Sequence, residues 1–152
     1  MDIQIATEEY LDDCLALAMK LWPDGEPYER MDALLNDIRS EDWACLLCQD
    51  GDRAVGFAEL SLRRDYVEGC DGSPVGYLEG VYVLPEYRRQ GVAKALLAFA
   101  EQWAAGKGCT QMASDCELTN GDSLRFHLGS GFTEANRIIC FVKDIDPPSG
   151  KA

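Results

Sequence analysis

The sequence predicts an α/β domain in which helices flank a mixed β-sheet. Short apolar runs of strand length alternate with longer stretches of helical periodicity, and an Asp-Gly turn joins two of the apolar runs as in an antiparallel hairpin. With 152 residues and 47% hydrophobic content, the chain suits one domain with a self-sufficient core. We predict that this domain spans 1–145 and that 146–152 form a flexible tail.

The elements of this domain follow from local patterns. Helices are predicted where apolar residues recur every three or four positions, and strands where β-prone residues form short runs. In chain order we predict a strand at 3–6, helices at 8–21 and 29–40, strands at 43–49, 54–62 and 77–84, a helix from Arg88 that ends at Gly106 and Gly108, a strand at 109–115, a helix from Asn120 to Ser130, and β structure over 132–143.

The charge balance is strongly acidic, with 14 Lys and Arg against 27 Asp and Glu and a net charge of -13. Such a surface repels nucleic-acid phosphates and anionic lipid, so we expect neither nucleic acid nor membrane as a partner. It attracts cations, although a well-solvated surface without a charged partner explains the same excess. The N-terminal MDIQIATEEY has no basic segment followed by an apolar run, so we expect a cytoplasmic protein.

The seven cysteines lack the paired spacing of a disulfide framework. Cys45 and Cys48 form a CxxC inside the strand-like run WACLLCQ, without the second CxxC or His pair that a zinc site needs. We therefore expect small buried thiols and no metal site.

The segment VLPEYRRQGVAKALL, residues 83–97, joins a strand to a long amphipathic helix. The first N–H groups of a helix lack internal partners and lie at the positive end of its dipole, so this turn can bind an anion. Gly91 lets phosphates approach the backbone, and Arg88 and Arg89 add charge-assisted contacts. A glycine-tolerant helix start with two solvated arginines is the alternative interpretation.

Two carboxylates lie close to this turn in the sequence. Glu79 interrupts an otherwise apolar strand, and Asp115 ends the next strand along the chain. A carboxylate beside a reacting amine can remove its proton, directly or through water. The plain alternatives are a solvent-facing strand residue for Glu79 and a loop cap for Asp115.

Two motifs resemble those of the GCN5-related N-acetyltransferase superfamily. The RxxGxA pattern of Arg88, Gly91 and Ala93 matches its acetyl-CoA motif, R/Q-x-x-G-x-G/A, and NGDSLRFHLGSGF is similar to its second signature. The resemblance covers nearly the whole chain. It implies the GNAT fold, a mixed sheet with splayed parallel strands flanked by helices. It also implies acetyl-CoA as co-substrate, without a metal.

The same resemblance implies where the cofactor binds. The turn from Arg89 to Lys94 would hold the diphosphate on backbone amides, the edge at 81–83 would pair with the pantetheine arm, and Val81 N–H would face the thioester carbonyl. The implied cofactor residues are Val81, Tyr82, Val83, Arg88, Arg89, Gln90, Gly91, Val92, Ala93, Lys94 and Asn120.

The run DYVEGCDGSPVGYLEGVYVLPEYRRQGVAK, the following MASD and the early LWPDG resemble aminoglycoside 6'-N-acetyltransferases of this superfamily. This resemblance implies a small polycationic aminoglycoside as substrate, direct transfer to its 6'-amine, antibiotic resistance and a homodimer. It implies drug contacts from Trp22, Tyr66, Glu79 and Asp115, with the two carboxylates as catalytic residues. Core packing is the alternative for the two aromatic residues.

Two positions depart from the family pattern. Asn136 stands where an acid is common, and its amide can still bond an ammonium or hydroxyl but attracts charge less strongly. His127, the only histidine, stands where many members have a tyrosine that protonates the CoA thiolate. A general-acid role and a structural role both remain open for it. The alternative functions are acetylation of a polyamine or peptide N-terminus, and a non-catalytic acyl-CoA-binding module.

Overall fold

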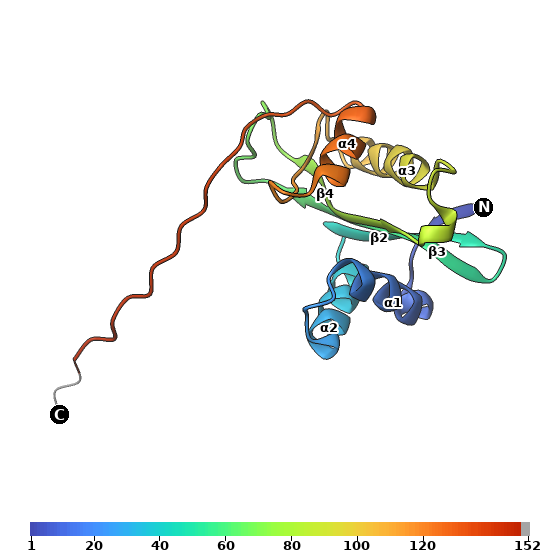
Figure 1. Cartoon of the computed structure of the whole chain (residues 1–152), viewed down its shortest axis with the longest axis horizontal. Helices are drawn as coiled ribbons and strands as arrows, with labels where there is room; N and C mark the ends of the chain where they lie inside the picture. The colour runs from blue at the N-terminus through green and yellow to red at the C-terminus, as the bar shows by residue number, and fades with distance from the viewer. Residues whose placement is uncertain (150–152) are drawn as a thin grey trace.

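The structure is a computed structural model that describes residues 1–149. A five-stranded sheet in the order β1-β2-β3-β4-β5 forms its centre, with α1 and α2 on one face and α3 and α4 on the other (Figure 1). The elements are β1 Asp2–Ile5, η1 Glu8–Tyr10, α1 Leu11–Leu21, α2 Pro27–Arg39, β2 Trp43–Asp50, β3 Arg53–Arg63, β4 Val75–Val83, η2 Pro85–Tyr87, α3 Val92–Gly106, β5 Met112–Ser114 and α4 Gly121–Gly129. The α/β class and mixed sheet predicted from the sequence are confirmed.

The first four strands are antiparallel to their neighbours, and β5 runs parallel to β4. The parallel pairing is short, because its last matched residues are Leu78 on β4 and Ser114 on β5. From Glu79 onward β4 continues without a strand partner on that side, which is the splay that the resemblance implied.

A bulge lies at this same point of β4. Glu59 of β3 pairs with Gly80, and the next residue, Leu60, pairs with Leu78. Glu79 is therefore an extra residue on β4, and such bulges re-aim side chains at functional sites.

The core fills both faces of the sheet. Phe57 and Leu60 of β3 and Leu96 of α3 are fully buried. Burial of each such side chain contributes about 1.5–3 kcal/mol. The core holds the strands in register, and with them the turn and the bulge.

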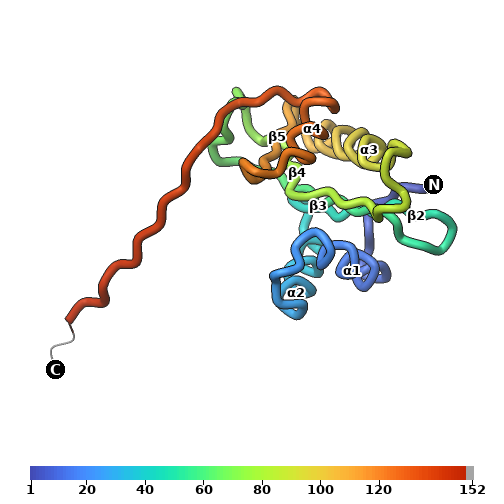
Figure 2. The backbone as a smooth tube through the Cα atoms, viewed as in Figure 1, coloured from blue at the N-terminus to red at the C-terminus, as the bar shows by residue number. Residues whose placement is uncertain are grey.

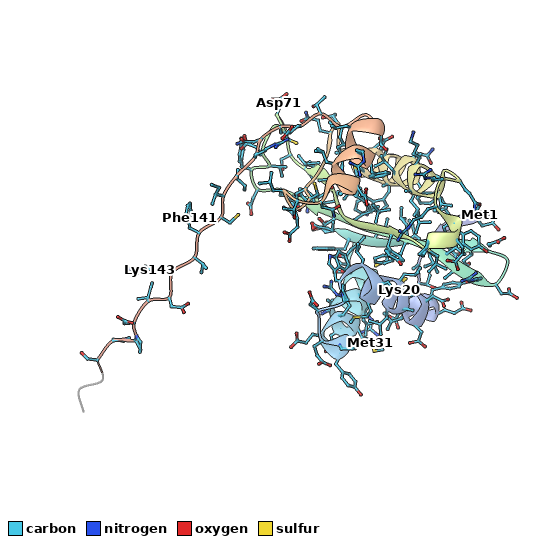
Figure 3. All side chains as sticks on the ribbon, in the orientation of Figure 1. Met1, Lys20, Met31, Asp71, Phe141 and Lys143 are labelled. Atoms are coloured by element: carbon cyan, nitrogen blue, oxygen red, sulfur yellow. The ribbon has the colours of Figure 1, made fainter. Side chains whose placement is uncertain are left out.

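The predicted β structure over 132–143 is wrong for the described chain. Residues 132–149 contain no helix or strand, and beyond Asn136 the chain runs away from the sheet (Figures 1 and 2). Phe141 and Lys143 project from this segment (Figure 3). A strand forms only against a partner edge, and none lies alongside this segment within residues 1–149. The predicted tail at 146–152 lies partly outside the described residues.

Candidate active site

The turn between β4 and α3 is shaped by its backbone. Arg89 has φ of +61° and Gly91 has φ of +80°, and Gly91 is the N-cap of α3 without any side-chain cap. Turns with left-handed residues can direct successive N–H groups toward one side, which creates an anion-binding concavity. A Cβ atom at Gly91 would meet no atom within 4 Å, so the space before this helix start is open. The turn therefore fits a phosphate group.

Two side chains of the turn stabilise it by hydrogen bonds to backbone carbonyl groups. Arg88 Nε donates to the Val83 carbonyl at 2.9 Å, and its guanidinium lies 5.4 Å from the Tyr82 ring centre. Gln90 Nε2 donates to the Glu86 carbonyl at 3.1 Å. Val92 is buried in the core, so its contribution to a ligand is limited to the backbone. The predicted cofactor turn thus presents amides, supported by Arg88 and Gln90.

Glu79 sits at the bulge with its carboxylate heavily bonded. Ser61 Oγ donates to Glu79 Oε1 at 2.8 Å. Arg63 donates to the same oxygen from Nη2 at 2.8 Å and from Nε at 3.2 Å, and Nη2 reaches Oε2 at 3.0 Å. The Glu79 side chain is 17% exposed and that of Arg63 is 42% exposed. Glu79 is therefore reachable from solvent, and Arg63 covers it.

Asp115 follows directly after β5 and accepts a hydrogen bond from the Tyr77 hydroxyl. Burial, followed by this bond, raises the pKa of Tyr77. The Arg63 guanidinium lies 3.3 Å from the Tyr77 ring centre. The two predicted catalytic carboxylates are thus joined by one chain of contacts through Arg63 and Tyr77.

Trp22 closes the end of α1 against the same part of β4. Its ring meets Phe57 edge-on at 6.5 Å, and Arg30 lies 4.4 Å over its centre. A Cβ atom on Gly80 would lie 2.5 Å from Trp22 Cζ2, so only glycine permits this approach. Trp22 therefore packs against Gly80, the residue after Glu79 in the chain, and its contact with a drug stays a prediction.

Tyr66 and Asn136 meet each other through a shared partner. The Tyr66 hydroxyl donates to Glu68 Oε2 at 3.1 Å, and Asn136 Nδ2 donates to Glu68 Oε1 at 3.4 Å. The Tyr66 side chain is exposed, so it is not a core residue. Tyr66, Asn136 and Glu68 thus form a second group, which is more exposed to solvent than Glu79 is.

Asn120 and His127 both make structural contacts in α4. Asn120 Oδ1 accepts from the Ser123 amide at 3.1 Å and so caps the helix. His127 Nδ1 donates to the Ser123 carbonyl at 2.7 Å, and Nε2 lies 2.8 Å from Ser114 Oγ. Since both ring nitrogens have partners, the structure favours the structural alternative for His127. The cofactor role of Asn120 stays a prediction.

Sequence reasoning missed a pair of acids, Asp37 and Glu59, close to Arg30 and Glu79. Glu59 is 6% exposed, and its Oε2 has no hydrogen-bond partner within residues 1–149. Burial above all, then the charge of Asp37, raises the pKa of Glu59 to about 7. Burial raises the pKa of Asp37 to about 6, while Arg30 opposes both shifts. Glu59 interrupts an apolar strand as Glu79 does, so the signal was present in the sequence.

Arg63 and Tyr77 were also missed, for a different reason. A strand-end arginine and a strand tyrosine are ordinary at such positions, and only the fold brings them between Glu79 and Asp115. No local pattern in the sequence distinguishes Arg63 from its neighbour Arg64.

The CxxC does not form a ligand pair. Cys45 and Cys48 lie three residues apart on β2 and therefore face opposite sides of the sheet. A hydrogen bond with Cys14, together with burial, raises the pKa of the Cys45 thiol, which keeps it protonated and unreactive. In the described part of the chain, no three His, Cys, Asp or Glu residues are arranged to hold a metal.

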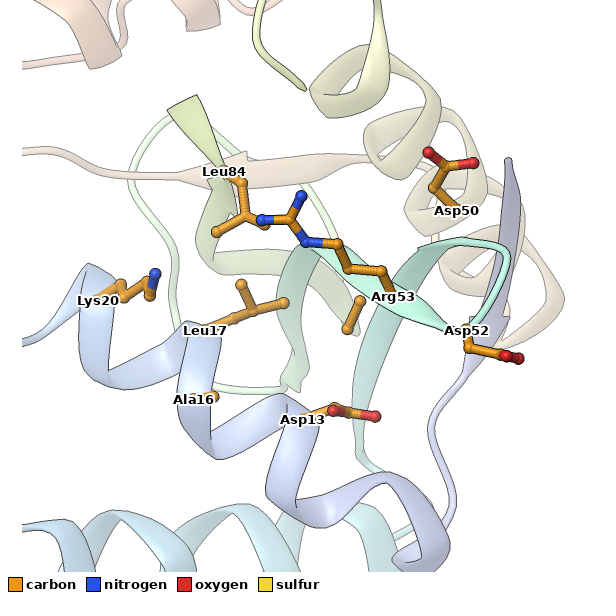
Figure 4. Close-up of a pocket in the computed structure, with 9 residues that line it drawn as sticks. Asp13, Ala16, Leu17, Lys20, Asp50, Asp52, Arg53 and Leu84 are labelled. Atoms are coloured by element: carbon orange, nitrogen blue, oxygen red, sulfur yellow. The ribbon is translucent and has the colours of Figure 1, made fainter. Parts of the chain in front are cut away.

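A pocket of about 600 Å³ lies elsewhere, between α1 and the β2–β3 hairpin. Leu17 and Lys20 of α1 face Arg53 and Leu84 across it (Figure 4). None of the predicted site residues lines this pocket, so it is not the candidate site.

An amide-lined turn, a splayed parallel strand pair and acids at the splay are the features of an acyl-CoA-dependent acetyltransferase. Residues 8–132 match the model of the acetyltransferase (GNAT) family. The chain belongs to this family. Among residues 1–149, no helix has the length and apolar character needed to span a membrane.

Several relatives carry a more specific name. The chain is 42% identical over 147 residues to aminoglycoside N(6')-acetyltransferase type 1 of Salmonella typhimurium, covering 94% of this chain and 99% of the relative. It is 40% identical over 144 residues to the protein of the same name from Serratia marcescens, with the same coverage of 94% and 99%.

Solved structures agree with this likeness. An aminoglycoside antibiotic 6'-N-acetyltransferase from Acinetobacter haemolyticus, in its apo form, has a TM-score of 0.91 at 39% identity and covers 96% of this chain and 100% of its own. Another acetyltransferase, solved with the bisubstrate analogue CoA-S-monomethyl-acetylneamine, has a TM-score of 0.87 at 37% identity and covers 95% of this chain and 98% of its own.

Proposed function

We propose that this chain is an aminoglycoside 6'-N-acetyltransferase, which transfers acetyl from acetyl-CoA to the 6'-amine and so confers aminoglycoside resistance. The observation that carries this proposal is the likeness, at about 40% identity over nearly the full length, to several relatives of that name. We also infer a cytoplasmic location, because all seven cysteines are free, as thiols in a reducing compartment are.

The cofactor half of the site fits acetyl-CoA by its backbone. The amides of the turn after Arg88 would hold the diphosphate, and the unpaired edge of β4 at 81–83 would bond the pantetheine amides. Val81 N–H would donate to the thioester oxygen as charge develops there. The role of acetyl-CoA is to supply an activated acetyl group.

The acceptor half would bind the amine and remove its proton. Glu79 and Asp115 would hold ammonium groups of the drug, and one of them would take the proton of the attacking nitrogen, directly or through water. The new C–N bond forms as the C–S bond breaks, and the thiolate leaves with the electron pair. Trp22 offers a flat apolar face to a sugar ring, and Tyr66 and Asn136 would bond its outer hydroxyls.

The test of this function is a thiol-release assay with acetyl-CoA and four amines. We expect turnover with kanamycin and none with an analogue that carries a 6'-hydroxyl, because only an amine at that position can form the amide. Turnover with spermidine or an N-terminal peptide alone would replace the drug assignment by one of those substrates. Binding of CoA without turnover on any amine would indicate a non-catalytic module.

We further propose a homodimer formed by the segment 132–149, called the C-terminal arm below. Its apolar side chains are 73–95% exposed, namely Ile138, Ile139, Phe141, Val142 and Ile145. In an extended chain these residues fall on both faces, as in a strand buried on both sides. The short strand β5 is the outer strand of the sheet, and a second copy's arm can extend it by strand addition.

The coverage of the solved relative supports this proposal. The structure of the Acinetobacter haemolyticus enzyme matches 96% of this chain, so the matched part includes most of the C-terminal arm. The relative therefore has a segment that corresponds to the arm. An isolated arm would expose a large apolar surface, whereas an exchanged arm buries it.

Light scattering coupled to gel filtration tests the homodimer. The full chain should elute as a dimer, and Phe141→Asp with Val142→Asp should yield monomers or weaken assembly at least tenfold, since two buried charges cost several kcal/mol. Lys143→Asp is the matched control, because it alters charge without removing apolar surface. A wild-type monomer, or a double variant that stays dimeric, would contradict the arm exchange.

A further inference from the structure

The carboxylate proposed to meet the substrate already has a cation bound to it. Arg63 makes three contacts within 3.2 Å to the two oxygens of Glu79, and Ser61 makes a fourth. Oε1 alone accepts three of these four contacts. A carboxylate has about four acceptor positions, so little capacity remains at Glu79 while Arg63 is in place.

Arg63 and Arg30 both contact predicted substrate residues, but they are held differently. Arg30 covers Trp22 and lies near the half-buried Asp37 and the buried Glu59, whose pKa values it lowers against the effect of burial. Arg30 is therefore the resident counter-ion of that group. Arg63 ends β3, is 42% exposed, and pairs with one carboxylate that solvent also reaches. Once displaced, its guanidinium is released into water and not into the core.

We propose that Arg63 is an exchangeable counter-ion of the amine site, which occupies Glu79 until an ammonium of the substrate displaces it. This inference rests on the proposed function. Displacement is unfavourable for any amine, because it breaks a bidentate ion pair and a stacking contact with Tyr77. A polycation offsets the loss with further ion pairs in the acidic cleft, whereas an amine with one charge does not. Arg63 therefore acts as a specificity-determining residue that selects for multiply charged amines.

The test compares Arg63→Gln with Arg64→Gln. Arg64 is the next residue and pairs with the exposed Asp42 at 2.7 Å, so its variant removes the same charge without freeing Glu79. For Arg63→Gln we expect KM for kanamycin to fall about two- to fivefold, the upper part of the range for loss of one competing solvent-exposed ion pair. The effect should fall on KM rather than on kcat, and Arg64→Gln should change KM less than twofold.

A second substrate tests selectivity. Methyl 6-amino-6-deoxyglucopyranoside carries one ammonium, and we expect Arg63→Gln to improve its kcat/KM by a larger factor than that of kanamycin, because kanamycin already offsets the displacement of Arg63 with further ion pairs. A direct readout is the Arg63 Nε–H signal in NMR, which should move on titration of kanamycin into the enzyme without acetyl-CoA.

The outcomes separate the two proposals. If the wild type acetylates kanamycin but Arg63→Gln leaves KM unchanged or raises it, the counter-ion inference is wrong and the proposed function stands. A fall in kcat at constant KM would mean that Arg63 positions Glu79 for the reaction instead. If the wild type acetylates none of the drugs, the proposed function itself fails.

Discussion

The proposed cofactor turn and the proposed amine site, called the cleft below, lie at the two ends of the splayed part of β4, and they are built by different means. The turn is one continuous segment, 88–94, whose shape comes from positive φ at Arg89 and Gly91. The cleft is assembled from side chains at the ends of α1, β3 and β5 and at the bulge of β4. A backbone-built site keeps its form without ligand, whereas a cleft built from side chains can be occupied by them.

The turn and the cleft also differ in whether side chains of the protein already occupy the binding groups. The space beside Gly91 is open, and Arg88 and Gln90 bond away from it to the backbone. In the cleft, Glu79 and Asp115 already have partners in Arg63 and Tyr77. Ligand binding to the turn adds contacts, while binding to the cleft exchanges them. The difference teaches that affinity for CoA and selectivity for the amine can be altered separately.

The largest expected effect is at the bulge. Glu79→Gln preserves shape but removes both the counter-charge for the substrate and a candidate base. We expect kcat/KM for kanamycin to fall at least a hundredfold, in the range for loss of a general base, with KM for acetyl-CoA changed less than threefold. Asp42→Asn is the control, since Asp42 also pairs with an arginine but lies outside the cleft. Activity within tenfold of wild type would leave Asp115 as the candidate base.

The next effect concerns the buried carboxyl group of Glu59. The pKa of Glu59 rises from 4.5 to about 7 on folding, so the native state holds this proton more tightly than the unfolded state. Stability from this group is fully present below about pH 4.5 and is lost as pH rises through 7. Glu59→Gln should therefore stabilise the protein by about 1–3 kcal/mol at pH 8 and by little at pH 4.5.

Urea unfolding at the two pH values, at one protein concentration, measures this difference. The pH dependence is the decisive quantity, because a packing change would shift stability equally at both. A destabilised variant at pH 8 would show that Glu59 is ionised and paired in the native protein. Retention of a destabilising acid beside the amine site is expected where function and stability conflict.

A smaller effect is predicted at the turn. Gly91→Ala forces an alanine to a φ of +80°, which costs about 1–2 kcal/mol, and its methyl group enters the space before α3. We expect KM for acetyl-CoA to rise about tenfold while KM for kanamycin changes little. Gly106→Ala, at the other end of the same helix and without positive φ, is the matched control. Equal loss for both substrates would contradict a site dedicated to the cofactor.

The contrast between the halves also explains what could be predicted from sequence. Glycine, a preceding strand and a following amphipathic helix are neighbours in the chain, so the turn, the helix α3 and the order of elements along the chain up to α4 could be predicted locally. Glu79 could be predicted because a charged residue within an apolar strand is recognisable from the sequence alone. Arg63 and Tyr77 could not be found, because their meaning depends on which residues the sheet register sets beside them. The prediction of a strand at 132–143 was wrong because no strand edge within residues 1–149 lies alongside this segment.

The smallest expected effect is at the open group formed with Glu68. Asn136 is exposed and donates a hydrogen bond to Glu68, so Asn136→Asp adds one negative charge at the surface. The interaction of one exposed charge with a ligand ammonium contributes well under about 1 kcal/mol. We expect KM for kanamycin to fall about two- to threefold at low salt and the gain to vanish near 0.5 M salt, where exposed charges are screened. Gln102→Glu adds the same charge at an exposed position of α3 that is not among the predicted site residues, and it should leave KM unchanged. An equal gain from both variants would mean that net charge steers the drug and that Asn136 does not contact it, which would confine drug binding to the cleft around Glu79.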